Sequence, residues 1–175
     1  MIAVRRVAAA TMLAALAGIS APSAFAAAAA TDDAPFLKAI HQGNLAEIAA
    51  GEDAGKHATA ACVKTVGATL VRDHRKLDAD VKSLARKLDV SLPAAPAPAQ
   101  QKALAAVQAK AGTSAYNTAW LKTEATGHVE TLELIDHEIE TGGNAEVRAA
   151  ASAARPVVAR HLELIRACEA DIDRS

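Results

Sequence analysis

Hydrophobic side chains recur every three or four positions along most of this chain, which is the spacing of one face of an α-helix. Five stretches show such a stripe, with polar residues on the opposite face. Alanine, the strongest helix former, is the commonest residue, and runs of β-branched residues are scarce. The pattern therefore predicts an all-α fold. The predicted helices are residues 34–53, 57–89, 99–111, 114–141 and 145–172.

Capping residues set the ends of these predicted helices. Asp32 and Asp33 followed by Pro35 are typical of a helix start, because an Asx side chain can accept from free backbone N–H groups and proline needs no partner there. Gly55 and Gly142 are typical of the position just after a helix end. The first and second predicted helices, and the last two, are therefore joined by short turns.

The sequence repeats its pattern after a shift of 87 positions without a gap. That shift places His41 on His128 and His74 on His161. Matching histidines on two helical hairpins indicate a duplicated helix pair that closes into a four-helix bundle. The connection between the hairpins, residues 90–112, is longer than antiparallel neighbours need. We therefore expect it to return along the bundle as a long crossover that contains a short extra helix.

The first residues are typical of a secretory signal peptide. Arg5 and Arg6 precede an apolar run, and Ala24-Phe25-Ala26 matches the small-x-small pattern at which signal peptidase cuts. No later apolar run reaches the roughly 20 residues that a spanning helix needs, so we expect no transmembrane segment after cleavage and a periplasmic location. The expected division is a cleaved signal peptide at 1–26, a disordered leader at 27–31 and one helical-bundle domain at 32–175.

Charge and motifs exclude several functional classes. Without Arg5 and Arg6, 17 of the 19 basic residues remain against 20 acidic ones, which argues against nucleic acid as a partner. The chain has no glycine-rich phosphate loop, no Ser-His-Asp order and no Cys-x-x-Cys motif. We therefore expect a binding protein and not an enzyme.

Four histidines lie on the apolar stripes of four different helices. They are His41, His74, His128 and His161, and Glu124 lies one turn before His128. Neutral imidazoles suit Zn, Cu, Ni and Fe, and a carboxylate can complete such a site or orient one of its rings. We therefore hypothesise an interior transition-metal site formed by these five residues.

Two other readings of the interior histidines are considered. A carboxylate di-iron site needs a glutamate three residues before its histidines, and Val71 and Val158 stand at those positions before His74 and His161. The second alternative is a hydrogen-bonded core network that only fixes the packing of a structural or stress-related protein, which binds an envelope protein partner through its surface. The sequence leaves metal binding and this network as open alternatives.

Cys62 and Cys168 belong to a chain that we expect to reach an oxidising compartment. In a simple up-down-up-down bundle their helices run parallel and the cysteines lie ~28 Å apart at a rise of ~1.5 Å per residue. With a crossover the helices are antiparallel, and both cysteines fall on the same side of the histidines, ~8 Å apart along the axis, which a shift of about one turn would close to the ~5.5–6 Å that a disulfide requires. We favour the crossover and hypothesise a bridge; the alternative is two free, buried thiols.

Several motifs together resemble one known family. They are Phe36-Leu37 with Gly43-Asn44-Leu45-Ala46-Glu47, Val71-Arg72-Asp73-His74, Tyr116, His128, and Pro156 through His161-Leu162. From about Phe36 to Ala167 the chain is similar to small exported bacterial proteins that form a domain of unknown function, often labelled "predicted outer membrane protein". The resemblance implies a ferritin-like bundle and an envelope location, and no particular reaction. His41 departs from the pattern, since the family usually has a small residue there.

Overall fold

The computed structural model describes residues 32–174, and every regular element in that range is an α-helix. The predicted signal peptide (1–26) and leader (27–31) lie outside the described residues. The helices are α1 (Ala34–His57), α2 (Ala61–Lys87), α3 (Pro98–Gln108), α4 (Ser114–Thr141) and α5 (Ala145–Asp173). The predicted all-α class is confirmed, and each predicted helix boundary lies within four residues of the observed one. Among these five helices, none combines the length and the hydropathy needed to cross a membrane.

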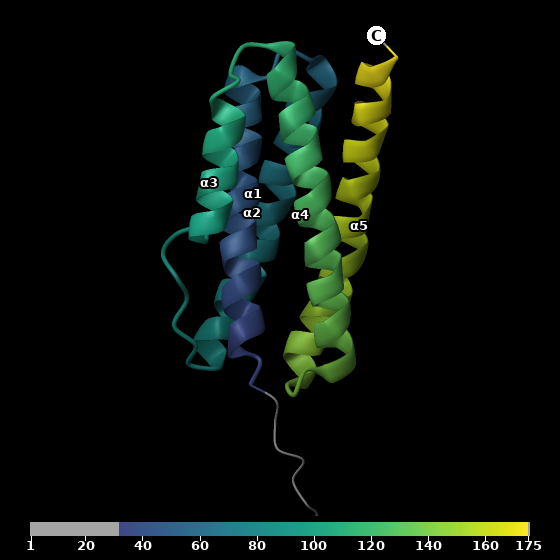
Figure 1. Cartoon of the computed structure of the whole chain (residues 1–175). Coiled ribbons are helices and arrows are strands. Elements are labelled where there is room, and N and C mark those ends of the chain that lie inside the picture. Colours follow the sequence, from purple (N-terminus) through teal and green to yellow (C-terminus); the bar gives the residue numbers. More distant parts are fainter. Residues whose placement is uncertain (1–31, 175) are drawn as a thin grey trace, which may run out of the picture.

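The four long helices form a bundle of two hairpins (Figure 1). α1 packs on α2 and α4 packs on α5, and the hairpins meet through α2 with α5 and α1 with α4. The short α3 packs along α1 and α4 and returns the chain towards the end of the bundle where α1 ends. α4 therefore begins at that end. As a result α2 and α4 run in the same direction, whereas α2 and α5 are antiparallel neighbours. The long connection thus returns along the bundle, as expected; a closer likeness to ferritin stays a prediction.

The first interhelical turn lies later in the chain than predicted. α1 continues through Gly55 and ends at His57. Asn117 on α4 fixes the turn there, because its Oδ1 accepts hydrogen bonds from the backbone N–H groups of Thr59 (3.1 Å) and Ala60 (3.3 Å). The prediction that Gly55 follows the helix end was therefore wrong. An anchor from a distant helix overrides the local preference of glycine for a helix end.

The apolar core consists of two clusters separated by a polar layer. One cluster lies towards the α1–α2 turn and includes Trp120 and Ile165. The other lies towards the α4–α5 turn and includes Leu37 and Ile135. Burial of these side chains supplies the main driving force for folding, so the two clusters hold the polar layer between them in place. That layer contains the interior histidines.

α1 and α2 approach most closely at two glycines. A Cβ atom at Gly51 would lie 2.5 Å from the carbonyl oxygen of Gly67 and 2.7 Å from Cγ2 of Val71, which is too close for any side chain. Only glycine at position 51 permits this distance between the helix backbones. The close approach brings the polar residues of α1 within hydrogen-bond reach of α2.

A disulfide joins the beginning of α2 to the end of α5. Cys62 and Cys168 are bonded, with their Cα atoms 5.7 Å apart. The bond is possible because the two helices run antiparallel, which follows from the crossover between the hairpins. It links the two hairpins covalently at the end of the bundle that contains the α1–α2 turn.

Candidate metal centre

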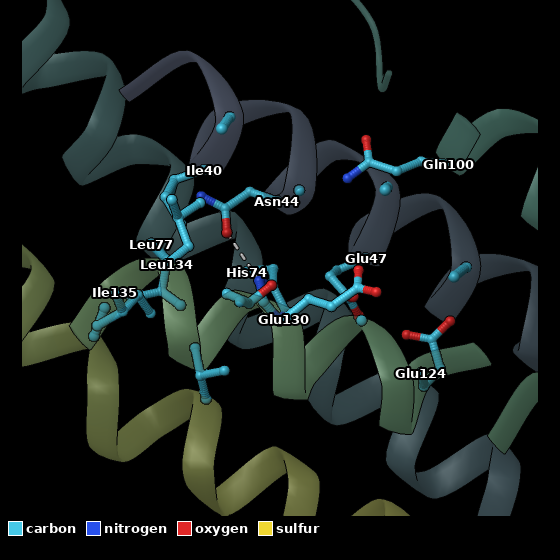
Figure 2. A pocket seen from close by; sticks show the side chains of 18 of the residues that line it. Ile40, Asn44, Glu47, His74, Leu77, Gln100, Glu124, Glu130, Leu134 and Ile135 are labelled. Atoms are coloured by element: carbon cyan, nitrogen blue, oxygen red, sulfur yellow. Dashed lines mark hydrogen bonds between the residues drawn. The ribbon is translucent and has the colours of Figure 1, made fainter. Parts of the chain in front are cut away.

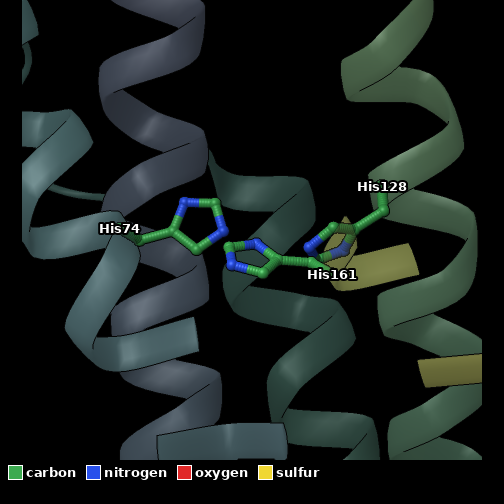
Figure 3. A group of neighbouring side chains, drawn as sticks. All are labelled: His74, His128 and His161. Atoms are coloured by element: carbon green, nitrogen blue, oxygen red, sulfur yellow. The ribbon is translucent and has the colours of Figure 1, made fainter. Parts of the chain in front are cut away.

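Three histidine rings converge in the polar layer of the bundle (Figure 3). His74 on α2, His128 on α4 and His161 on α5 are each at most 3 % exposed, and their ring centroids lie 5.1–5.8 Å apart. One nitrogen of each ring lies within 4.8 Å of one nitrogen of both other rings. Three of the four predicted histidines thus meet, although they come from three different helices.

The outward-facing nitrogens of His74 and His128 are held by oxygen atoms that can only accept. Nδ1 of His74 lies 2.9 Å from Oδ1 of Asn44 on α1. Nδ1 of His128 lies 2.8 Å from the backbone carbonyl oxygen of Glu124, one turn earlier on α4. Because these oxygens accept hydrogen bonds, each ring carries its proton on Nδ1 and donates it. Nε2 of both rings is therefore an unprotonated nitrogen with a lone pair.

The third ring is oriented by a carboxylate. Nε2 of His161 lies 3.0 Å from Oδ2 of Asp73 on α2 and donates to it. Asp73 also accepts two hydrogen bonds from Arg72, and these bonds are the largest cause that lowers the Asp73 pKa to about 2. Asp73 is therefore an ionised acceptor, and the lone pair of His161 lies on Nδ1. Carboxylate-to-histidine contacts of this kind commonly orient metal ligands.

The three remaining ring nitrogens have no hydrogen-bond partner among the described residues. They are Nε2 of His74, Nε2 of His128 and Nδ1 of His161, and all three atoms are buried. A buried acceptor without a donor costs roughly 1–3 kcal/mol. The arrangement therefore concentrates three unsatisfied lone pairs in one small volume.

Burial keeps the three rings neutral. It lowers the pKa of His74 to about 3 and of His128 to about 4, and it also lowers the pKa of His161. Repulsion between the rings, were they charged, adds to the lowering for His74 and His128. A neutral imidazole is the form that ligates a metal.

A pair of buried carboxyl groups borders the cluster. Glu47 on α1 and Glu124 on α4 offer oxygens within 4.8 Å of each other and of a nitrogen of His128. Burial raises the pKa of Glu124 to about 6, and burial together with the neighbouring Glu124 raises the Glu47 pKa well above its usual range. The predicted Glu124 thus lies beside the histidines, with its carboxyl facing Glu47.

His41 does not join the cluster, so its predicted place in the site was wrong. Its Nδ1 lies 2.5 Å from Oδ1 of Asp78, and its Nε2 lies 3.0 Å from the carbonyl oxygen of Pro93 in the connection to α3. The late end of α1 explains the difference: it shifts the pairing of α1 with α2 by about one turn. Asn44, one turn along the same face, consequently stands opposite His74.

Two acidic residues of α2, Asp73 and Asp78, contact interior histidines, although neither was predicted as a site residue. Asp78 is buried beside His41, and Asp73 reaches inward to His161. Two further residues near the cluster, Asn44 and Glu47, were also missed as site residues. Both follow His41 on α1 at helical spacing, which was the available signal.

The donor set suits a transition metal. Imidazole nitrogens bind Zn²⁺ at roughly 2.0–2.1 Å, and one nitrogen of each ring already lies within 4.8 Å of the other two, so three ligand atoms are close together before an ion binds. Three neutral imidazoles fit Zn, Cu, Ni or Fe better than they fit Mg or Ca, which prefer oxygen. Asn44, Asp73 and a backbone carbonyl already hold the rings from outside, as the outer partners of metal ligands do.

The fold and the site together define an all-helical bundle protein with a buried cluster of three histidines. The family described as "Domain of unknown function (DUF4142)" matches residues 19–168, which is most of the sequence. The chain belongs to this family, and the predicted resemblance is confirmed. No curated protein and no solved structure matches the chain.

Proposed function

We propose that this protein binds a single transition-metal ion through His74, His128 and His161. The observation that carries the proposal is the direction of the three rings: each donates its one N–H outward and leaves an unprotonated, buried nitrogen facing the other two. A metal ion satisfies three lone pairs at once, which no neutral hydrogen-bond donor of a single side chain can do.

The same observation argues against a core network without metal. In such a network hydrogen bonds satisfy both nitrogens of each ring, whereas in this bundle they satisfy one nitrogen of each. The described contacts of these rings contain no bond between two of them, and their outer partners are all acceptors. Adding roughly 1–3 kcal/mol for each unsatisfied nitrogen, the metal-free cluster destabilises the bundle, whereas a bound ion removes that penalty.

We further propose that the protein works in the periplasm as a binding protein and not as an enzyme. The signal-peptide pattern of residues 1–26 supports export, and the Cys62–Cys168 disulfide suits an oxidising compartment. A carboxylate di-iron oxidase is not supported, because Val71 and Val158 stand where its glutamates belong.

Metal titration of untagged protein tests the proposal. Protein purified from the periplasm and freed of metal by a chelator should bind one equivalent of Zn²⁺, Cu²⁺, Ni²⁺ or Fe²⁺ in calorimetry. At a free metal concentration of about 100 times the Kd, the free energy of unfolding should rise by about 2.7 kcal/mol, since the ion binds only the folded state.

A matched pair of variants assigns the binding to the cluster. His161→Gln should abolish stoichiometric binding, whereas His137→Gln should leave it unchanged, because His137 is exposed on α4 and its Nε2 lies 3.3 Å from Oγ1 of Thr141. Sub-stoichiometric binding by the wild type without thermal stabilisation, or binding by His161→Gln equal to the wild type, would overturn the proposal. That outcome would favour the alternative of a structural or stress-related envelope protein.

A further inference from the structure

A second binding feature is a pocket between the two hairpins. It has a volume of about 670 Å³ and is lined by residues of all five helices, most of them on α1 and α4. This volume is within the roughly 300–1,000 Å³ that is typical of sites for small organic molecules. Its walls are mainly aliphatic. Examples are Ile40, Leu77, Leu84, Leu104, Leu134 and Ile135.

Small residues on the facing helices leave this space open. Gly43 on α1 lines the pocket, and a Cβ atom built there meets nothing within 4 Å. Gly127 on α4 also lines the pocket, and a Cβ atom at this position would lie 3.8 Å from Oε1 of Glu47. Longer side chains at these two positions would fill the volume. The pocket therefore results from specific residues on the walls.

The pocket has an apolar end and an acidic end. Figure 2 shows Ile40, Leu77, Leu134 and Ile135 on one side, and the carboxyl groups of Glu47 and Glu124 on the other. Its charged lining residues are four acidic side chains and one basic side chain. These are Glu47, Asp80, Glu124 and Glu130, and Lys122.

Two buried polar atoms on the lining residues lack partners. Oε2 of Glu47 and Nδ2 of Asn44 have no hydrogen-bond partner among the described residues. Asn44 is only 4 % exposed, so its amide cannot rely on bulk solvent. An amino group of a ligand would donate a hydrogen bond to Oε2 of Glu47 and match the excess of acidic side chains, whereas Nδ2 of Asn44 is a donor and needs an acceptor.

We propose that this pocket binds a small amphipathic amine, with its alkyl or aryl body between the aliphatic walls and its amino group at Glu47 and Glu124. A fatty acid of the same size would bring a carboxylate beside the Glu47–Glu124 pair, where burial already raises the pKa of both carboxyls and so disfavours further negative charge. A hydrated metal ion would lose water against aliphatic walls without gaining ligands along most of their length. Of the three proposed metal ligands, His74 lines the pocket, whereas His128 and His161 do not, so the amine would lie beside one metal ligand and His161→Gln separates the two sites.

Competition between three ligands of one chain length tests the proposal in the intact, metal-free protein. The fluorescent probe N-phenylnaphthylamine is bound first and then displaced by octylamine, octanol or octanoate. Octylamine should displace the probe at a concentration at least about tenfold lower than octanoate, which corresponds to about 1.4 kcal/mol. In Glu47→Gln/Glu124→Gln this preference should disappear, while octanol should bind as before.

Substitutions at two glycines of α1, Gly43 and Gly55, test where the ligand binds. Gly43→Phe should weaken octylamine binding at least about tenfold because the ring fills the pocket, whereas Gly55→Phe should not change it. Both positions leave open space for a Cβ atom, and only Gly43 lines the pocket. Equal loss in both variants would overturn the assigned site, and the wild-type competition keeps the test valid if either variant fails to fold.

The remaining outcomes separate this inference from the metal proposal. Equal displacement by octylamine and octanoate, or no displacement by octylamine, would overturn the amine proposal. A third outcome would also overturn the amine proposal. If the wild type binds no amine and Gly43→Phe takes up Zn²⁺ more slowly than the wild type, the pocket is a path for the metal ion. His161→Gln should lose metal binding and keep amine binding.

Discussion

The most direct consequence of the three-histidine cluster concerns stability at acid pH. Burial lowers the pKa of His74 to about 3 and also lowers the pKa of His161, whereas both titrate near 6.5 in the unfolded chain. Below pH 6.5 the unfolded state therefore binds protons that the folded state does not bind. Folding stability must fall as the pH falls through this window, so replacing both residues by Gln should remove that contribution.

The size of the effect follows from the number of protons. Each histidine that stays neutral in the folded state contributes up to about 1.4 kcal/mol per pH unit. The wild type should thus lose at least about 1.2 kcal/mol more than His74→Gln/His161→Gln between pH 6 and pH 5, which is the contribution of His74, and the lowered pKa of His161 adds to this loss. Glu47 and Glu124 act in the opposite sense, because their raised pKa values make the folded state bind protons first. The wild type and the double variant both retain these carboxyls. The difference between their losses of stability therefore reports the contribution of the histidines.

Urea unfolding in the presence of a chelator measures this difference. Trp120 is the only tryptophan and is fully buried, so its fluorescence reports unfolding directly. His57→Gln/His137→Gln is the reference, since it removes two histidines whose rings reach solvent. If the cluster variant loses stability between pH 6 and pH 5 as steeply as the wild type, the rings are not held neutral in the fold and the reasoning is refuted.

Two further predictions concern how the bundle is held together. Cys62→Ala/Cys168→Ala should lower the free energy of unfolding by about 4–5 kcal/mol, because the bridge closes a loop of 106 positions; an unchanged urea midpoint would contradict this. Gly51→Ala and Gly55→Ala share a helix-propensity gain of about 1 kcal/mol, but the added methyl group at Gly51 overlaps the carbonyl oxygen of Gly67. Thermal unfolding should therefore show Gly51→Ala less stable than Gly55→Ala by about 1–3 kcal/mol, and equal melting temperatures would mean that the helices separate freely.

Much of the fold could be predicted because helix periodicity and capping act locally. The five helices, the return of the connection and the antiparallel pairing of α2 with α5 all follow from stripes, prolines and loop length. The end of α1 could not be predicted. Gly55 is a good residue after a helix end, but the contact of Asn117 with the backbone of Thr59 and Ala60 places the turn later, and that contact joins residues 58 positions apart.

The candidate site was predictable only as far as the stripe of each helix allowed. His74, His128 and His161 lie on the apolar stripes of their helices, so each was expected to face the interior. They then come together once the two hairpins pack against each other. The α1 residue that lies opposite His74 depends on how far α1 is shifted along α2. The prediction was wrong by about one turn, so it placed His41 where the structure has Asn44.

The pocket lay beyond such reasoning. It depends on how far α1 stands from α4, which is set by packing of the two hairpins and not by the pattern of either helix alone. Gly43 and Gly127 lack a Cβ atom, and nothing in the periodicity indicated that both line one open space. Distances between elements that are remote along the chain are the part that a periodicity argument cannot supply.

The disulfide also divides the molecule into a covalently closed ring and an open arm. The ring runs from Cys62 to Cys168 and includes nearly all of α2, together with α3, α4 and most of α5, whereas α1 lies outside it. When the chain opens locally, α1 can leave without stretching the ring, so we expect its amide hydrogens to exchange before those of α2 and α5. Its departure would remove Asn44 from His74 and Glu47 from Glu124 in a single step, opening the histidine layer and one wall of the pocket while the ring still holds the three imidazoles near one another.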